Sequence, residues 1–279
     1  MKTYTLKANS HWNTEGVRRV ASQIHIAREL PKKISITRDI LECWHPTIEE
    51  DDGVVAYLTR NYSLWIVIGD NELYANEDSS YLFMGFNNCC TIDGLDLINT
   101  QNVQSFDSAF AYCGCNAKMF SIKGIEKWNT SSVRNMWRMF TFTGYYARKW
   151  DIGDLSGWDT SNVTDMSFMF CNAGYSATIW NIGILSNWNV ANVINMTCMF
   201  MRAGYNADSF DIGDLSRWNI ANVSYMENMF LSAGHCAKKF ILDGLEEWDL
   251  SHSTKRPITK KCLLIQEVLM TTGKRNELS

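Results

Sequence analysis

Cysteine and histidine side chains lie close together at several points of the chain, where they could bind zinc or form a nucleophile–base pair. The close pairs are Cys43 and His45, Cys89 and Cys90, Cys113 and Cys115, and His235 and Cys236. A zinc site usually draws on two CxxC-like pairs, and a catalytic Cys–His pair needs a third group that orients the base. We therefore expect no metal ion and no other cofactor, and we predict that most thiols pack in a core.

Other motifs of catalysis are missing from the sequence as well. The chain contains no HExxH, GxSxG, P-loop or GxGxxG string. We therefore expect a protein that is not an enzyme. No apolar stretch approaches 18 residues, and the first residues lack the apolar segment of a signal peptide. With nine cysteines, an odd number, these features favour a cytosolic or virion-associated protein with free thiols over a classically secreted one, while surface display stays open.

A repeat of 30 residues without insertion or deletion organises the chain from Thr91 to Phe240. The five units are 91–120, 121–150, 151–180, 181–210 and 211–240. Each has Trp or, in the first unit, Ile at its eighth position, Phe at its twentieth and Gly at its twenty-fourth. A fixed period of 20–50 residues is typical of stacked supersecondary units. It directs the search for function towards surfaces and partners.

The unit 151–180 shows what each repeat is expected to form. Alternating apolar residues predict a short strand at 178–183. Turn residues should end it, as Gly153-Asp154 end the equivalent strand one repeat earlier. The Thr-Ser-Asn string at 160–162 is typical of a helix start, and the apolar spacing across 163–170 predicts a short helix. Gly174 then stands where that helix should stop.

A single such unit cannot bury its own aromatic residues, so copies must stack. We predict an α/β solenoid, a leucine-rich-repeat-like stack of strand–turn–short helix units with a parallel strand ladder. Caps should close both ends, because an open stack exposes apolar surface there. Asn162, Asn192 and Asn222 share one position, where they either cap the predicted helices or bond the backbone of a neighbouring unit.

The strings WDTSNVTDMSFMF, WNVANVINMTCMF and WNIANVSYMENMF resemble the BspA-like, or DUF285, bacterial surface protein repeat, a relative of leucine-rich repeats. The resemblance covers about 79–254. It implies a non-enzymatic adhesion or recognition protein and supplies no catalytic residues. The chain departs from that family in its period, 30 rather than about 26, and in lacking the signal peptide or lipobox of cell-surface members.

The ends of the chain predict four regions. Residues 1–52 form a small N-terminal α+β extension or docking element, with a helical stripe over 17–27 and strand-like alternation at 34–36. Residues 53–90 form a cap and a degenerate first repeat, with strands at 53–58 and 64–68. A degenerate helix is predicted near 79–83, in a unit that is three residues shorter than the 30-residue repeat. Residues 91–254 hold the five repeats and a partial sixth, and 255–279 a C-terminal capping helix and tail.

Residues that recur at one position of every repeat belong to the scaffold. We interpret the Met, Phe and Trp ladders as core, although the Trp ladder could instead be a carbohydrate-binding strip. Outward strand positions vary between repeats, as a recognition surface must. These candidate partner-binding residues are Met119, Lys149, Ile179, Ser209 and Lys239, with Asp151, Asn181 and Asp211.

Charge is uneven between the repeats: unit 121–150 carries +5 and unit 151–180 carries −4. Such bands can steer a protein partner or set the register of self-association. A basic unit beside an acidic one is a poor track for nucleic acid, which we do not expect to bind. The sequence favours a non-catalytic scaffold that recognises a protein partner, a surface receptor or a surface glycan. The alternative is a structural or host-attachment component of a phage or viral particle.

Overall fold

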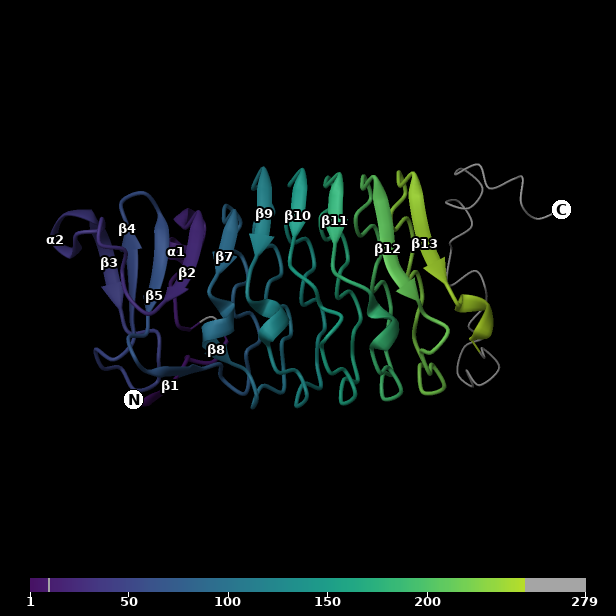
Figure 1. Ribbon diagram of the computed structural model, residues 1–279, viewed down its shortest axis with the longest axis horizontal. Helices are drawn as coiled ribbons and strands as arrows, with labels where there is room; N and C mark the ends of the chain where they lie inside the picture. Colours follow the sequence, from purple (N-terminus) through teal and green to yellow (C-terminus); the bar gives the residue numbers. More distant parts are fainter. Residues whose placement is uncertain (10, 249–279) are drawn as a thin grey trace.

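The computed structural model describes residues 1–9 and 11–248, with the repeats following one another along its longest axis (Figure 1). The strands before the repeats are β1 (Thr3–Thr5), β2 (Gln23–Ala27), β3 (Ile40–Trp44), β4 (Val55–Thr59), β5 (Ser63–Val67) and β6 (Glu72–Tyr74). The strands of the repeats are β7 (Thr91–Asp93), β8 (Ile98–Asn99), β9 (Met119–Ile122), β10 (Lys149–Asp151), β11 (Ile179–Asn181), β12 (Ser209–Asp214) and β13 (Lys239–Asp243). The helices are α1 (Glu15–Val20), α2 (Ile36–Asp39) and the 3-10 turns η1 (Leu95–Leu97), η2 (Ile125–Lys127), η3 (Leu185–Asn187) and η4 (Leu245–Glu247).

Corresponding strands of neighbouring repeats are parallel, and their register follows the 30-residue period. Pairing of β9, β10 and β11 places Phe120, Trp150 and Trp180 opposite one another, and β12 pairs with β13 in the same way. The rings of Trp180 and Phe210 stack with centroids 4.9 Å apart, which continues the aromatic column from the eight-stranded sheet to the two-stranded one. The strand predicted at 178–183 is confirmed as β11.

The helix predicted over 163–170 is wrong, because this backbone bonds to the next repeat instead of coiling on itself. Phe168 has a φ of 59°, a left-handed value that a right-handed helix excludes. The N–H groups of Met166 and Phe170 donate to carbonyl oxygens of the next repeat, at 3.0 and 2.8 Å. In the described repeats, residues 91–248, the helical segments are three-residue 3-10 turns that precede the tryptophan position. The predicted unit of strand, turn and short helix therefore has turn-rich backbone in place of its helix.

The recurring aromatic residues fill the core, as predicted. Neighbouring phenylalanine rings from Phe110 to Phe230 stack with centroids 5.3–5.4 Å apart. The Trp158 side chain is 3% exposed, and its indole N–H donates to the carbonyl oxygen of Ile125 in the preceding repeat at 3.1 Å. The same bond recurs at each tryptophan of this ladder. Buried rings cannot present faces to a sugar, so the carbohydrate-strip interpretation of this ladder is wrong.

The asparagines that recur at one position of the repeat donate hydrogen bonds to neighbouring repeats and do not cap helices. The amide of Asn162 donates to the carbonyl oxygen of Ser131 at 2.7 Å. Asn192 and Asn222 make the same bond at the same distance, each to the preceding repeat. Of the two roles left open by the sequence, the structure therefore shows the inter-repeat bond.

Strands of the N-terminal region belong to the same sheet as strands of the repeats. Its main sheet has the strand order β11-β10-β9-β7-β2-β5-β4-β3, so β2 lies between the first repeat strand and β5 (Figure 1). Ile24 and Ile26 of β2 point into the core, while Gln23 pairs with Thr91 on one side and Ser63 on the other. The predicted boundary between 52 and 53 therefore marks no break in the sheet, because β2 and β3 on one side of it pair with β5 and β4 on the other.

Local predictions for the N-terminal region had mixed outcomes. The strands predicted at 53–58 and 64–68 are confirmed as β4 and β5. The stripe over 17–27 is split, since α1 ends at Val20 and β2 begins at Gln23, and the alternation at 34–36 leads into α2 rather than a strand. The degenerate helix predicted near 79–83 is a turn. The parallel bridge between Asp78 and Ser105 confirms that this unit is three residues shorter than the 30-residue repeat. The capping helix predicted within 255–279 lies outside the described residues.

Glycine at the twenty-fourth position provides a test of the close packing between repeats. Gly174 has a φ of +55°, and a Cβ there would lie 2.8 Å from Trp180 and 2.9 Å from Trp150. We expect Gly174→Ala to lower the free energy of unfolding by about 2–5 kcal/mol, from left-handed strain and overpacking together. Urea denaturation followed by tryptophan fluorescence measures this change.

The matched control is Gly157→Ala. A Cβ on Gly157 meets no atom within 4 Å, and no positive φ strains this residue. This variant should change the free energy of unfolding by less than about 0.5 kcal/mol. Equal stabilities of the two variants would contradict the packing described here.

Candidate partner-binding surface

Five of the candidate residues lie in a single row where the repeat strands begin. Met119, Lys149 and Ile179 pair in register on β9, β10 and β11, and Ser209 pairs with Lys239 on β12 and β13. We call these five residues the strand row. The backbone N–H of Asp208 donates to the carbonyl oxygen of Thr178 at 3.0 Å and links the two sheets next to the row.

The strand row exposes apolar side chains beside charged ones. Met119 is 63% exposed and Ile179 is 56% exposed, while Lys149 between them is also exposed. Large apolar side chains that stay in solvent on a hydrogen-bonded sheet do not contribute to its core. Such residues are the ones that can lose their hydration on contact with a partner.

The other three candidates hold the backbone of their own repeats. The side-chain oxygens of Asp151, Asn181 and Asp211 each accept a hydrogen bond from the glycine N–H two residues later, at 3.2, 3.0 and 3.1 Å. This Asx turn leads into a glycine of positive φ, and it ends the strand in β10 and β11. The recurrence of Asp or Asn at this position thus has a structural explanation, and these residues belong to the scaffold.

The lysines of the strand row have carboxylates nearby. Lys149 Nζ lies 3.9 Å from Asp151, and Lys239 Nζ lies 3.7 Å from Asp211. Both lysines are more than half exposed, so these pairs contribute little to stability and can exchange for a partner's carboxylate. The structure therefore joins the two sets of predicted residues, with the turn-holding aspartates positioned beside the lysines.

Eight of the nine cysteines and four of the five histidines lie within the described residues 1–9 and 11–248. No group of three His, Cys, Asp or Glu side chains there is arranged to hold a metal ion. Burial raises the pKa of the Cys113 and Cys198 thiols, and it raises the pKa of Cys171 to about 11. A raised pKa disfavours the thiolate, the form that acts as nucleophile.

Two arrangements could not be found from the sequence, because strands far apart in the chain create them. His25 Nδ1 lies 2.8 Å from Asp93 Oδ1, and its ring stacks on Trp65 with centroids 4.1 Å apart. Only the insertion of β2 between β5 and β7 brings the three together. They lie on one outward face of the sheet, and only the alternation of polar and apolar residues along 23–27 hinted at that face.

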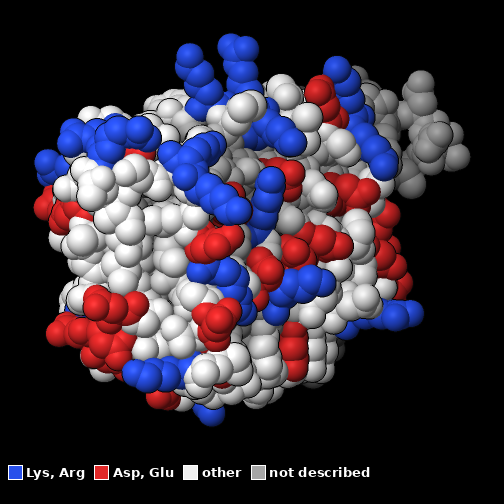
Figure 2. Space-filling view, turned by 60° about the vertical axis from the view of Figure 1, so that its left-hand side comes forward, with Lys and Arg blue, Asp and Glu red and all other residues white. Residues whose placement is uncertain are grey.

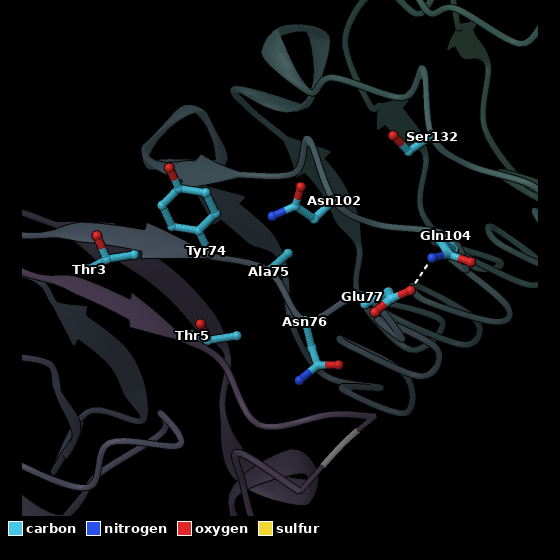
Figure 3. A pocket seen from close by; sticks show the side chains of 9 residues that line it. All are labelled: Thr3, Thr5, Tyr74, Ala75, Asn76, Glu77, Asn102, Gln104 and Ser132. Atoms are coloured by element: carbon cyan, nitrogen blue, oxygen red, sulfur yellow. Dashed lines mark hydrogen bonds between the residues drawn. The ribbon is translucent and has the colours of Figure 1, made fainter.

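The second arrangement is a polar pocket of about 620 Å³ beside the small sheet β1-β6-β8 (Figure 3). It is lined by Thr3, Thr5, Tyr74, Ala75, Asn76, Glu77, Asn102, Gln104 and Ser132. Glu77 accepts a hydrogen bond from Gln104, Asn76 donates to the carbonyl oxygen of Leu6, and Ser132 donates to that of Gln101. These bonds connect loops to one another, and Glu77 is the one carboxylate among the lining residues.

Comparisons with known proteins address the repeats. The family model described as "Mycoplasma protein of unknown function, DUF285" matches residues 78–181 and 143–259. No curated protein and no solved structure matches the chain. Among the described residues, no helix has the length and apolar character needed to cross a membrane.

The division between scaffold and strand row can be tested on two residues of β11. Asn181→Ala removes the acceptor for the N–H of Gly183 and should lower the free energy of unfolding by about 0.5–1 kcal/mol. Ile179→Ala removes an exposed side chain and should leave it unchanged. Urea titration of both variants decides the matter, and a larger loss for Ile179→Ala would reverse the assignment.

The thiol environments predict an order of alkylation. At pH 8 a thiol of pKa about 11 is thiolate in only about one molecule in a thousand, and Cys171 is also buried. Iodoacetamide should label the exposed Cys43 and Cys236 of the folded protein long before Cys171. Peptide mass spectrometry over time measures the order, and urea should abolish the difference. Rapid labelling of Cys171 in the folded protein would contradict its burial.

Proposed function

We propose that this chain, which belongs to the DUF285 family, is a non-catalytic repeat scaffold that recognises a protein through its strand row. In this proposal the 91–248 region is a leucine-rich-repeat-like solenoid whose repeats supply rigidity, and the strand row supplies the contacts. The observation that carries the proposal is the exposure of Met119 and Ile179 on either side of Lys149, at one level of a parallel sheet.

A protein partner fits this row better than a glycan. Exposed Met and Ile gain free energy by losing water against an apolar surface, and the lysine between them can meet a carboxylate. Sugars are held by aromatic faces and dense polar groups, but the strand row contains no aromatic ring. The hydrogen-bonded ladder fixes the backbone beneath the row, so little conformational entropy is lost when a partner binds.

Photo-crosslinking from inside the row tests the proposal. With p-benzoylphenylalanine at Ile179, we expect one reproducible protein adduct in the organism's own cells or particles. Lys149→Glu together with Lys239→Glu should reduce its yield about tenfold, because both charges facing the partner are reversed.

The matched control places the same photoreactive group at Ile194. This residue is 47% exposed and precedes Asn195, which lies in the bridge ladder of the turn-rich half of the repeats and not on the strands. It should give no such adduct. Equal adducts from both positions, or an adduct at Ile179 that ignores the two lysine reversals, would rule out the strand row as the binding surface.

A further inference from the structure

Exposed aromatic rings form a connected group beside the strand row, at the turn that precedes β9 and β10. Tyr112 stacks on Phe142 with ring centroids 5.1 Å apart, and Phe142 lies 5.4 Å from Tyr145. Tyr146 meets Tyr145 edge to face at 4.8 Å. Tyr146 is 63% exposed and Tyr112 is 41% exposed, so the group presents two tyrosines to solvent.

Two basic residues, Lys118 and Arg148, stand in the chain between the exposed tyrosines and the strand row. The N–H of Arg148 donates to the carbonyl oxygen of Lys118 at 2.9 Å, which holds these two residues side by side on neighbouring repeats. Arg148 follows Tyr146 by two residues and precedes Lys149 of the row. We call Tyr112, Tyr146, Lys118 and Arg148, with Met119 and Lys149, the aromatic–basic corner.

The corner carries positive charge that the protein does not neutralise. Lys118 and Arg148, both exposed, form no ion pair with any carboxylate of the described residues, whereas Lys149 pairs with Asp151 at 3.9 Å. The chain as a whole has a net charge of −4. In Figure 1 the repeat strands start at the upper edge, and Figure 2, turned about the vertical axis, shows Lys and Arg gathered along that edge with Asp and Glu more frequent below.

We propose that the aromatic–basic corner is the centre of the binding surface and that it takes an acidic segment of a partner protein. This inference deepens the proposed function and rests on it. Arg148 can hold a carboxylate through two parallel hydrogen bonds, and Lys118 adds a second cation on the neighbouring repeat. The Tyr, Arg and Met residues of the corner belong to the residue types that are enriched at protein interfaces.

A nucleic acid fits the corner less well. Single strands bind by stacking bases on open aromatic faces along a continuous basic groove. Here Tyr145, Tyr175, Tyr205 and His235 stack on one another at 4.7–4.8 Å, so their faces are already covered. The basic residues also do not continue along the stack. The positions equivalent to Lys118 and Arg148 on the next two repeats are occupied by Thr178 and Asp208.

Fluorescence anisotropy with defined probes tests the partner chemistry on the full chain. The probes are a fluorescein-labelled peptide of alternating Glu and Leu, its Gln–Leu counterpart and an oligothymidylate of similar length. We expect the Glu peptide to bind at least about tenfold more tightly than the other two. Equal or tighter binding of the oligothymidylate, or no preference for Glu over Gln, overturns the proposal.

Matched variants locate the binding site. Lys118→Glu with Arg148→Glu should weaken Glu-peptide binding at least about tenfold, whereas Lys127→Glu with Arg217→Glu, the same charge change at exposed positions elsewhere on the repeats, should weaken it less than about threefold. Tyr146→Ala should weaken binding without a change of charge. Equal losses from both double variants would show that net charge alone binds the peptide, and would overturn the assignment to the corner.

The outcomes also separate this inference from the proposed function. If the Ile179 crosslink persists while the Glu peptide fails to bind, the strand row stands and the acidic partner chemistry is wrong. If the peptide binds at the corner but the crosslink is absent, the corner has its ligand class and the native interface does not extend along the strand row to Ile179. Thermal melts of each variant confirm that it is folded.

Discussion

Backbone N–H groups in the turn-rich half of each repeat donate to carbonyl oxygens of the following repeat, and this bond determines most of the structure. Met166 and Phe170 donate in this way, and their equivalents do so in the repeats on either side. A buried N–H without a partner is costly, so each repeat depends on the next to satisfy its backbone. A residue inserted within this segment would shift the donors that follow it past their acceptors, so the spacing inside the segment must stay constant from repeat to repeat.

This dependence between repeats also explains how the stack begins. The first repeat needs a neighbour on its N-terminal side, and the chain supplies two. Strand β2 pairs with β7, while the short unit at 78–90 offers its backbone to the turn-rich half of the first repeat. The N-terminal region is therefore a template for stacking, built from segments that are distant in sequence.

The same bonds set the limits on function. Positions that face the core or hold a turn are fixed by the neighbouring repeats, as the Asx turns of Asp151 and Asn181 show. Variation is free only where a side chain leaves the stack, and there Met119, Arg148 and Ile179 stand in solvent. A partner would thus meet a rigid surface whose chemistry differs from repeat to repeat.

The sequence by itself determined the period, the core positions and the strand at 178–183. These features depend on residue types that recur at a fixed spacing, and a recurring apolar residue has the same burial in each copy. It could not distinguish a helix from the turn-rich backbone at 163–170, because both place apolar side chains at similar spacings on one side. Only the hydrogen bonds to the next repeat separate them.

Tertiary structure alone decided which segments meet. The insertion of β2 between β5 and β7 pairs residues that are at least 40 positions apart in the chain, such as Gln23 and Ser63, and no local pattern encodes such pairing. The candidate site divides in the same way. Sequence variation found the exposed row, but the hydrogen bond of Asn181 and the ring contacts that join Tyr112 to Tyr146 depend on the folded backbone. Three-dimensional contacts thus separated the side chains that hold the stack from those that remain exposed to solvent.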